Sequence, residues 1–364
     1  MDIHNIRRIA IKIGSNVLSN DDGSINRHHI YEIVREIAKI RESGIEVILI
    51  SSGAVACGRD TIREHVVKKL DSVQQRQLYS AVGQITLMNL YSQFFGDYGL
   101  QVGQVLTTKE NFKTRTLYLN QKNCISTMLE NGIIPIVNEN DTVSITELMF
   151  TDNDELSGLV ATMMDVQILL ILSNVNGIFK GDPKEKGSTV IREVEPGTDL
   201  TGYISSGKSG FGRGGMVTKY NIASKVAKEG ITVVIANGKK DASIITGVVF
   251  TPDQYTFTRF IPQQHNLSGV KKWIAHSNGF AKGSIYINAN TVKAISGERA
   301  TSILPVGVTK VEGEFEKDDL IMVLSEDGEN LGMGKSAYNS AKAAQIAGKH
   351  GCRPIIHYDY LFLY

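Results

Sequence analysis

Residues 149–164, with the sequence MFTDNDELSGLVATMM, place four acidic or amide side chains directly before an apolar segment. One Asp or Asn here would be enough to cap a helix, because its side chain accepts hydrogen bonds from the free amides of the first turn. The run of four, at 152–155, indicates in addition that the helix start faces a polar or charged ligand. A calcium loop of the EF-hand type is excluded, since its fifth and sixth positions require a polar residue and Gly, and the sequence has Leu and Ser there.

Two lysines occupy positions that suit a phosphate group. Lys12 interrupts the apolar run at 9–13 and is followed by Gly14. A lysine in a buried strand is costly unless an anion meets it, although a lysine on an edge strand would reach solvent. Lys219 ends the glycine-rich GRGGMVTK at 212–219, ahead of a segment with helical periodicity. Glycines before a helix start, together with a lysine, favour a nucleotide polyphosphate, but such a loop can also be a flexible connection.

Polar residues also follow three other apolar runs. They are Ser52 in SSGA, Asn138, Glu139, Asn140 and Asp141 in NENDTV, and Ser173 and Asn174 in LSNVNG. Amides and acids suit the ammonium group of a ligand, and small residues let a ligand approach the backbone. A single Ser or Asn of this kind is equally compatible with a capped turn, so the recurrence at several strand ends is what indicates a site.

A formal phosphate-loop match, GYISSGKS at 202–209, satisfies the pattern GxxxxGK[ST]. That motif works when a buried strand leads into it and a helix leads out, so that backbone amides converge on phosphate. The preceding REVEPGTDL contains no apolar run, and another glycine-rich stretch follows. We therefore interpret the match as a chance one and keep a P-loop NTPase as an alternative function.

The elements that must position these residues alternate along the first two thirds of the chain. Nearly continuous apolar runs predict strands covered on both faces, and segments with helical periodicity lie between most of them. This alternation predicts an α/β fold, a three-layer sandwich with a mainly parallel sheet that binds ligands at the carboxyl ends of its strands. The predicted strands are 9–13, 46–51, 101–107, 133–138, 167–173 and 231–237, and the predicted helices include 28–44, 74–95 and 117–131.

The pattern changes after about residue 250. Residues 251–269 carry two prolines and little periodicity, and short alternating segments follow, one of which predicts a hairpin turning at Asp327-Gly328. The sequence thus predicts a first domain at 1–255, a linker at 256–270 and a small, mostly β domain at 271–358.

Composition excludes several classes of protein. The 364 residues are 42% hydrophobic and 21% charged, as in ordinary globular domains. The formal net charge of +1 gives no electrostatic reason to expect nucleic acid or a membrane surface as a partner. The three cysteines lack CxxC spacing, which argues against a zinc site and a disulfide framework. No signal peptide and no apolar run of about 20 residues is present, so we expect a cytoplasmic location.

Together these stretches resemble the amino acid kinase family, and within it the kinases that phosphorylate the γ-carboxylate of glutamate. The matching motifs, in chain order, are IKIGSNVL, SSGAVACGR, IPIVNENDTV, TDNDELSGLVA, NGIFKGDP and GRGGMVTK. The part that opens with VKKWIAHSNGFAKGSIYI resembles a PUA domain. The resemblance implies the amino acid kinase fold, ATP as substrate with Mg²⁺ bound through its phosphates, and L-glutamyl 5-phosphate as product in the first step of proline biosynthesis.

The resemblance also implies roles for the candidate residues, with no metal ligand among them. Lys12 and Lys219 would contact the transferring phosphoryl group, and Asp154 would position both lysines. Glutamate would be held by Ser52, Asp141 and Asn153, with Asn140 and Asp152 nearby. ATP would be bound by Lys12, Gly14, Ser173, Asn174, Gly212, Arg213, Gly214, Gly215, Met216, Val217, Thr218 and Lys219, and NGIFKGDP would border the adenine.

Two positions depart from the family pattern, which has Thr-Asp where this chain has Ser173-Asn174 and Thr where it has Arg213. Either change could alter nucleotide preference without removing a proposed catalytic group. The partners that the resemblance implies are proline as a feedback inhibitor, glutamyl phosphate reductase as receiver of the reactive product, and further copies of the chain in a homo-oligomer.

Two alternatives to a glutamate kinase remain open besides the P-loop NTPase. Aspartate, acetylglutamate and uridylate kinases share the core, although NENDTV, TDNDELS and the C-terminal domain favour glutamate. An RNA-binding protein is the alternative from a different class, because PUA domains elsewhere contact RNA. Residues 270–350 contain ten Lys or Arg and nine Asp or Glu, so the basic surface typical of nucleic-acid binding is missing.

Overall fold

A computed structural model describes most of the chain, and its described residues fall into two compact units. Residues 1–111 and 119–266 make up the first unit, and residues 112–118 and 267–364 make up the second. The described residues are 6–62, 70–144, 150, 152–181, 187–204, 215–263, 271, 273–274, 281–297 and 301–364.

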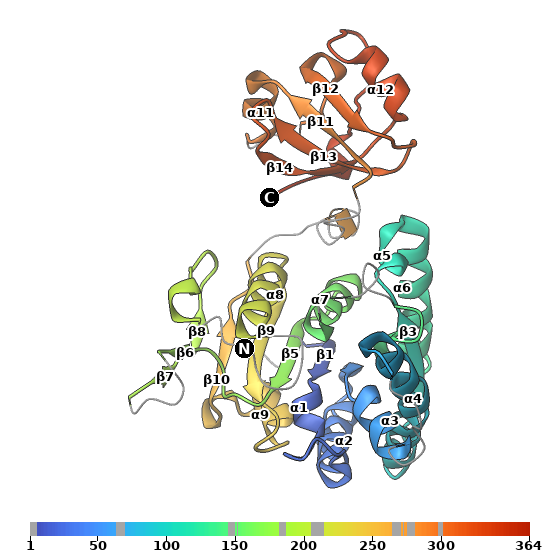
Figure 1. Ribbon diagram of the computed structural model, residues 1–364. Helices are drawn as coiled ribbons and strands as arrows, with labels where there is room; N and C mark the ends of the chain where they lie inside the picture. The colour runs from blue at the N-terminus through green and yellow to red at the C-terminus, as the bar shows by residue number, and fades with distance from the viewer. Residues whose placement is uncertain are drawn as a thin grey trace. The chain divides into compact units, whose positions relative to one another are not determined.

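The first unit is built on an eight-stranded sheet (Figure 1). Its strands run in the order β3-β4-β2-β1-β5-β9-β10-β8, and the pairs from β3 to β9 are parallel, whereas β10 runs antiparallel to β9. All six strands predicted from apolar runs are present, which confirms the mainly parallel sheet. Their bounds are β1 Arg8–Ile13, β2 Glu46–Ser51, β3 Val102–Thr107, β4 Ile134–Glu139, β5 Ile168–Ser173, β8 Glu193–Val194, β9 Thr232–Asn237 and β10 Phe257–Phe260.

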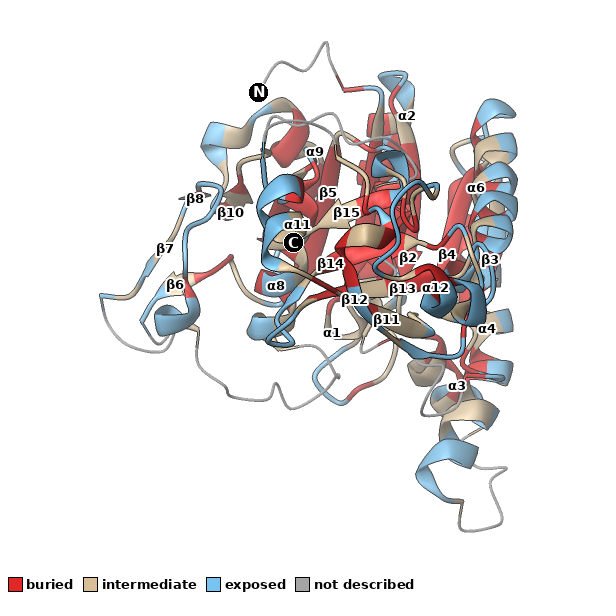
Figure 2. Cartoon of the chain, turned by 90° about the horizontal axis from the view of Figure 1, so that it is seen from above, coloured by how far each residue is buried: buried red, intermediate tan, exposed pale blue. Residues whose placement is uncertain are grey.

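Helices cover both faces of this sheet, as the strand–helix alternation predicts. Helices α7 and α8 pack on one face, and α2 and α9 pack on the other. Figure 2 shows the inner strands as buried and the outer surface of α6 as largely exposed. The helices are α1 Ser15–Leu18, α2 Arg27–Glu42, α3 Ala54–Ile62, α4 Ser72–Gly96, α5 Glu110–Lys113, α6 Arg115–Glu130, α7 Asn153–Met163, α8 Met216–Lys228 and α9 Ile244–Phe250.

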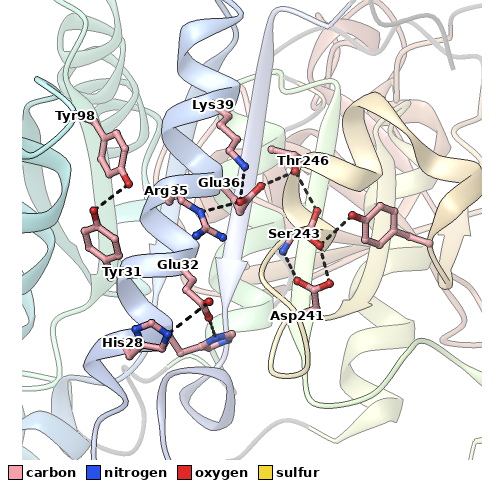
Figure 3. Close-up of polar contacts among 12 residues, drawn as sticks. His28, Tyr31, Glu32, Arg35, Glu36, Lys39, Tyr98, Asp241, Ser243 and Thr246 are labelled. Carbon is pink, nitrogen blue, oxygen red and sulfur yellow. Dashed lines mark hydrogen bonds and ion pairs between the residues drawn. The ribbon is translucent and has the colours of Figure 1, made fainter.

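A buried acid on α2 ties this helix to α9 (Figure 3). Glu36 is 1% exposed and accepts hydrogen bonds of 2.7 Å from Lys39 Nζ and from Thr246 Oγ1 of α9. Burial alone would raise the pKa of Glu36, but Lys39, Thr246 and Arg35 together hold that pKa below its usual value. The ionised carboxylate therefore links two helices on the face of the sheet opposite α7.

The predicted linker, at 256–270, was placed too early in the chain. Residues Phe257–Phe260 form β10, which pairs with β9 and β8, and the first unit extends to residue 266. Phe257 and Phe260 are buried, but two apolar residues separated by Thr-Arg are too short a signal to stand out beside two prolines. A small hairpin, β6 Phe179–Lys180 with β7 Thr189–Val190, was likewise not predicted.

The second unit is a mostly β domain, as predicted. Its five strands run in the order β12-β11-β13-β14-β15, and the predicted hairpin joins β13 to β14 with Gly328 at a φ of 86°. The sheet continues past residue 358, where we expected the domain to end, because β15 pairs with β14. The bounds are β11 Gly283–Ile287, α11 Ala289–Ile295, β12 Val308–Gly313, β13 Leu320–Ser325, β14 Asn330–Lys335, α12 Ser340–Ile346 and β15 Leu361–Leu363.

Short 3-10 helices complete the described elements: η2 Thr201–Tyr203, η3 Pro252–Gln254, η4 Pro305–Gly307 and η5 Tyr358–Tyr360. None of the described helices combines the length and the apolar character that crossing a bilayer requires.

Two glycines let α3 and α4 approach each other closely. A Cβ atom on Gly83 would lie 1.8 Å from the carbonyl oxygen of Ala54, and one on Gly58 would lie 1.8 Å from that of Tyr79. Because the atoms in the way are backbone atoms, neither helix can accept a side chain there without moving.

We expect Gly83→Ala to lower the free energy of unfolding by about 1–3 kcal/mol or more, since overpacking forces the backbone to shift. Gly96→Ala is the matched control, because a Cβ at the last residue of the same helix meets no atom within 4 Å. Urea denaturation of both variants checks the prediction. Equal stability of the two variants would show that α3 and α4 do not need this close contact.

Candidate active site

The carboxyl ends of four neighbouring strands open into one cavity. Strands β4, β2, β1 and β5 are adjacent and parallel, so their last residues lie along the same edge of the sheet. The cavity at this edge has a volume of about 1110 Å³ and is lined by these strand ends and by the first residues of α3, α7 and α8. This is the edge at which parallel α/β sheets bind their ligands.

Two lysines meet one carboxylate in this cavity. Lys12 Nζ lies 2.6 Å from Asp154 Oδ1, and Lys219 Nζ donates a hydrogen bond of 2.9 Å to Asp154 Oδ2. The exposed fractions are 5% for Lys12, 8% for Lys219 and 0% for Asp154. Three residues that are distant in sequence and were predicted to act together thus form one buried cluster, with a formal charge of +1.

The alternation of side chains along β1 places Lys12 on the face of the sheet against which α7 packs. Ile9, Ile11 and Ile13 belong to the core that includes α2. Successive side chains of a strand point to opposite faces, so Lys12 points toward the face on which α7 packs. β1 lies between β2 and β5, so Lys12 is an interior lysine and not the edge-strand lysine considered as an alternative.

The acidic run before α7 has two separate roles. Asp152 is the N-cap, and its Oδ1 accepts hydrogen bonds from the backbone amides of Asp154 (2.9 Å) and Glu155 (3.0 Å). Asp154 lies within the first turn. Its side chain does not cap the helix and instead contacts the two lysines. The cap therefore fixes the first turn, and the first turn carries the carboxylate that separates the two lysines.

The lysines determine the charge state of Asp154. Burial alone would raise the pKa of its carboxyl group, but the charges of Lys12 and Lys219 and their hydrogen bonds hold that pKa below its usual range. At Asp152, burial and the neighbouring Asp154 charge outweigh the same lysines and raise the pKa. The two acids of one helix start thus have pKa values shifted in opposite directions.

Ser52, Asn153 and Asn138 form a polar wall beside this cluster. Asn153 Nδ2 donates to Ser52 Oγ at 2.8 Å and to Asn138 Oδ1 at 3.1 Å. Asn138 is the fifth residue of β4, and it is one of the four polar residues at 138–141 that the sequence singled out at this strand end, although no specific role was predicted for it. Ser52 and Asn153, predicted to bind the same substrate, are thus in direct contact.

Two acids at and just after the end of β4, Glu139 and Asp141, are held by an arginine of α4. Arg76 Nη2 lies 2.7 Å from Glu139 Oε2 and also forms an ion pair with Asp141 Oδ1. Glu139 further accepts a hydrogen bond of 3.0 Å from the backbone amide of Phe150. Sequence reasoning missed Arg76, because no motif surrounds it and it lies 63 residues from its nearer acid.

Most predicted residues line the cavity, but Asn140 does not. Its Oδ1 accepts a hydrogen bond of 2.6 Å from Thr142 Oγ1 within the same turn, and it faces a separate hollow of about 350 Å³ beside α4. The prediction of Asn140 as a residue near the substrate is thus not supported by its position. The predicted residues that line the cavity are Lys12, Gly14, Ser52, Asp141, Asp152, Asn153, Asp154, Ser173, Asn174, Gly215, Met216 and Lys219.

The remaining nucleotide candidates fall in two groups. Val217 and Thr218 belong to the first turn of α8 and are absent from the cavity lining. Gly212, Arg213 and Gly214 lie outside the described residues. In the part of the chain that the structure describes, no group of three or more His, Cys, Asp or Glu could hold a metal ion.

The start of the phosphate-loop match does not have the required geometry. Gly202 lies inside the 3-10 helix Thr201–Tyr203, and the nearest preceding strand, β8, ends at Val194. Since a phosphate loop follows directly on a buried strand, the described residues contradict the P-loop alternative. Residues 205–209 of the match lie outside the described residues.

Sequence comparisons find similar proteins over almost the whole length of the chain. The sequence model of the amino acid kinase family matches residues 7–237, and that of the PUA domain matches residues 283–358. A curated glutamate 5-kinase from Bacteroides thetaiotaomicron is 59% identical over 356 residues, which is 98% of this chain and 98% of that protein. The glutamate 5-kinase of Chlorobaculum tepidum is 45% identical over 98% of this chain and 97% of its own length.

A solved structure shares the fold of the first unit. Carbamate kinase from Giardia lamblia bound to AMP-PNP aligns with a TM-score of 0.53 at 16% identity, covering 71% of this chain and 99% of that one. At this identity the likeness concerns the fold alone.

Proposed function

The chain belongs to the amino acid kinase family, among its glutamate 5-kinases, and we propose that its cavity transfers the γ-phosphoryl group of ATP to the γ-carboxylate of L-glutamate. The product is L-glutamyl 5-phosphate, which opens the route to proline. The observation that carries this proposal is the buried pair of lysines on Asp154, a cationic cluster with a formal charge of +1 that faces the cavity.

The reaction needs positioning and charge more than acid–base chemistry. A γ-carboxylate oxygen attacks the γ-phosphorus of ATP, the bond from that phosphorus to the β–γ bridging oxygen breaks, and ADP leaves with the electron pair. The nucleophile is already ionised at neutral pH, so no general base is required. Lys12 and Lys219 would neutralise charge on the phosphoryl oxygens, as such transfers require, and Asp154 would keep the two ammonium groups near each other.

Mg²⁺ bound to ATP would add positive charge at the β- and γ-phosphates. Both oxygens of Asp154 are taken by lysines, so the residues at this end of the cavity fit an ion that the nucleotide carries. What the chain itself supplies there is cationic side chains and the backbone amides at the start of α8, whose N-cap is Gly215.

Acidic side chains are available in the cavity for the amino-acid substrate. Asp141 and Asp152 line it together with Ser52 and Asn153. Asp152 Oδ2 is buried and has no hydrogen-bond partner among the described residues. This oxygen can therefore accept a hydrogen bond from a ligand. The α-ammonium group of an amino acid would meet that requirement, while a nucleoside monophosphate would be repelled by the same acids.

The test is ATP consumption with glutamate, aspartate, acetylglutamate and UMP, using hydroxylamine to trap an acyl phosphate as hydroxamate. We expect hydroxamate with glutamate and at most a small fraction of that rate with the other three. Higher kcat/KM with aspartate or acetylglutamate would assign the chain to another branch of the family. A filter-binding titration at low salt would detect the RNA-binding alternative, for which tight, salt-sensitive affinity is required.

We further expect proline to compete with glutamate, as the sequence resemblance implies. Raising glutamate at saturating ATP should then restore the initial rate at any proline concentration, with kcat unchanged and the apparent KM raised. Equilibrium dialysis provides the direct check, since each ligand should displace the other. Simultaneous binding of both without mutual effect would contradict this expectation.

The remaining partners follow from the resemblance and from the product's chemistry. An acyl phosphate reacts with water, so hand-off to glutamyl phosphate reductase would protect it. A homo-oligomer and a cytoplasmic location remain predictions, and the latter is supported by Cys57, Cys124 and Cys352 all being free thiols.

A further inference from the structure

The acids at the end of β4 create an electrostatic problem. Glu139 and Asp141 are 5% and 9% exposed, and they lie close enough for the charge of one to act on the other. Two neighbouring carboxylates that are withdrawn from water tend to share a proton, because the like charge and the burial both disfavour ionisation. A protonated Asp141 would offer no negative charge to a ligand's ammonium group.

Arg76 is a cation that contacts both acids. It reaches them from α4, contacts Glu139 Oε2 at 2.7 Å and contacts Asp141 Oδ1. Burial and the Asp141 charge raise the pKa of Glu139 even with Arg76 in place. Among the described residues, Arg76 and Asp141 are the charged groups that act on Glu139, and the Phe150 amide completes its hydrogen bonds.

We propose that Arg76 is a positioning residue for the amino-acid substrate, which by bridging Glu139 and Asp141 keeps Asp141 ionised and turned into the cavity. This inference rests on the proposed function, and it adds a residue of α4 that sets the pH range over which the amino acid binds. A single guanidinium nitrogen, Nη2, contacts both carboxylates, and it has two N–H donors with which to do so.

The sign of the pH effect follows from the charges. Asp141 must be deprotonated to receive an ammonium group, so the affinity for the amino acid falls as pH drops through the pKa of the acidic pair. An opposite charge at this distance lowers a carboxyl pKa by about 1–3 units. Without Arg76, loss of binding should therefore begin about 1–3 pH units higher, and KM measured below the shifted pKa should rise by about tenfold for each unit of the shift.

Kinetics of Arg76→Met test the proposal. We expect the acid limb of KM for glutamate to shift upward by about one pH unit or more, so that KM within that limb rises by about tenfold or more. We expect kcat to stay within about threefold because no phosphoryl contact is lost. Arg76→Lys should show a smaller shift, since an ammonium keeps the positive charge. Gln77→Ala is the matched control: it removes the neighbouring hydrogen bond from α4 to Thr142 O (3.0 Å) without changing charge, and its pH profile should match the wild type.

The double variant Arg76→Met with Glu139→Gln distinguishes the effect of the Arg76 charge from the effect of its packing. It keeps the net charge of the cluster at the wild-type value, and the substituted amide can still accept from the Phe150 amide through its carbonyl oxygen. We expect the acid limb to return to within about half a pH unit of the wild type, whereas additive damage would show that Arg76 acts only as packing. Should Arg76→Met fail to fold, Arg76→Lys carries the same comparison.

A second measurement separates failure of this inference from failure of the proposed function. The rise in unfolding temperature on adding glutamate, followed from pH 5 to 9, reports binding without turnover. A wild-type protein that makes no hydroxamate would refute the proposed reaction, while the pH dependence of this stabilisation would still judge Arg76. An unchanged pH dependence in both Arg76→Met and Arg76→Lys would overturn the inference.

Discussion

Replacing Asp154 with Asn is expected to lower kcat for phosphoryl transfer by about tenfold to a hundredfold or more. The carboxylate separates the Nζ atoms of Lys12 and Lys219, at 2.6 Å and 2.9 Å from its two oxygens. At about 4 Å and an effective dielectric constant of about 20, each charge pair is worth about 4 kcal/mol before compensation. Each tenfold in rate requires about 1.36 kcal/mol, so the expected loss remains after most of that energy is offset by solvent and rearrangement.

The fold of Asp154→Asn should survive, because the helix cap is a different residue. Asp152 accepts the two amide hydrogen bonds of the first turn, and Asn has nearly the shape of Asp. We still expect lower stability at neutral pH, since two buried lysines lose their counter-charge. The folded-state pKa of Asp154 is lowered, so this stability difference should be full above the unfolded-state pKa of about 3.9 and should disappear as pH falls through the folded-state pKa.

Glu155→Gln provides the matched control for this variant. Glu155 lies in the same first turn and forms an ion pair of 3.4 Å with Lys109, but it does not line the cavity. Its neutral replacement should leave kcat within about twofold, as expected of a partly exposed ion pair. A folded Asp154→Asn protein with normal kcat would show that the acid only helps the helix to start, and would refute the arrangement proposed for the lysines.

The strands, and most of the residues at their ends, could be predicted because both follow from local patterns. Apolar runs such as 168–173 are long enough to mark buried strands, and parallel strands bring their carboxyl ends together whatever the loops between them do. The lysine near the carboxyl end of β1 was informative for a related reason: a buried strand excludes a lysine that has no partner. Sequence therefore predicted that Lys12 needs an anion, and the structure supplies Asp154.

What could not be predicted depends on geometry that no short window contains. The NENDTV segment offers four acidic or amide side chains in succession, and only the end of β4 at Glu139 decides which of them line the cavity. Asn138 lies in the strand and reaches Asn153, whereas Asn140 lies in the turn and bonds to Thr142. Arg76 was missed because its partners come from another element, so that its role exists only after folding.

The second large effect is expected from the lysines themselves. Lys12→Ala and Lys219→Ala should each lower kcat by about a hundredfold to a thousandfold, the range found when one donor to a developing negative charge is removed. KM for glutamate should change much less, because a contact made mainly in the transition state acts on kcat. Single-turnover rates with saturating ATP and glutamate measure this directly.

The pairing of the lysines makes a further distinction possible. Removing one lysine leaves Asp154 with a single cation, so the cluster changes from a formal charge of +1 to zero. If both lysines act on one phosphoryl group, Lys12→Ala and Lys219→Ala combined should cost less than the product of the separate losses, because residues that act as a unit are not additive. Lys208→Ala, from the phosphate-loop match, should keep kcat within about tenfold, under about 1.4 kcal/mol in barrier. A variant of Lys12 or Lys219 with normal kcat and only a raised KM for glutamate would place that lysine in substrate binding and would leave phosphoryl transfer without its proposed source of positive charge.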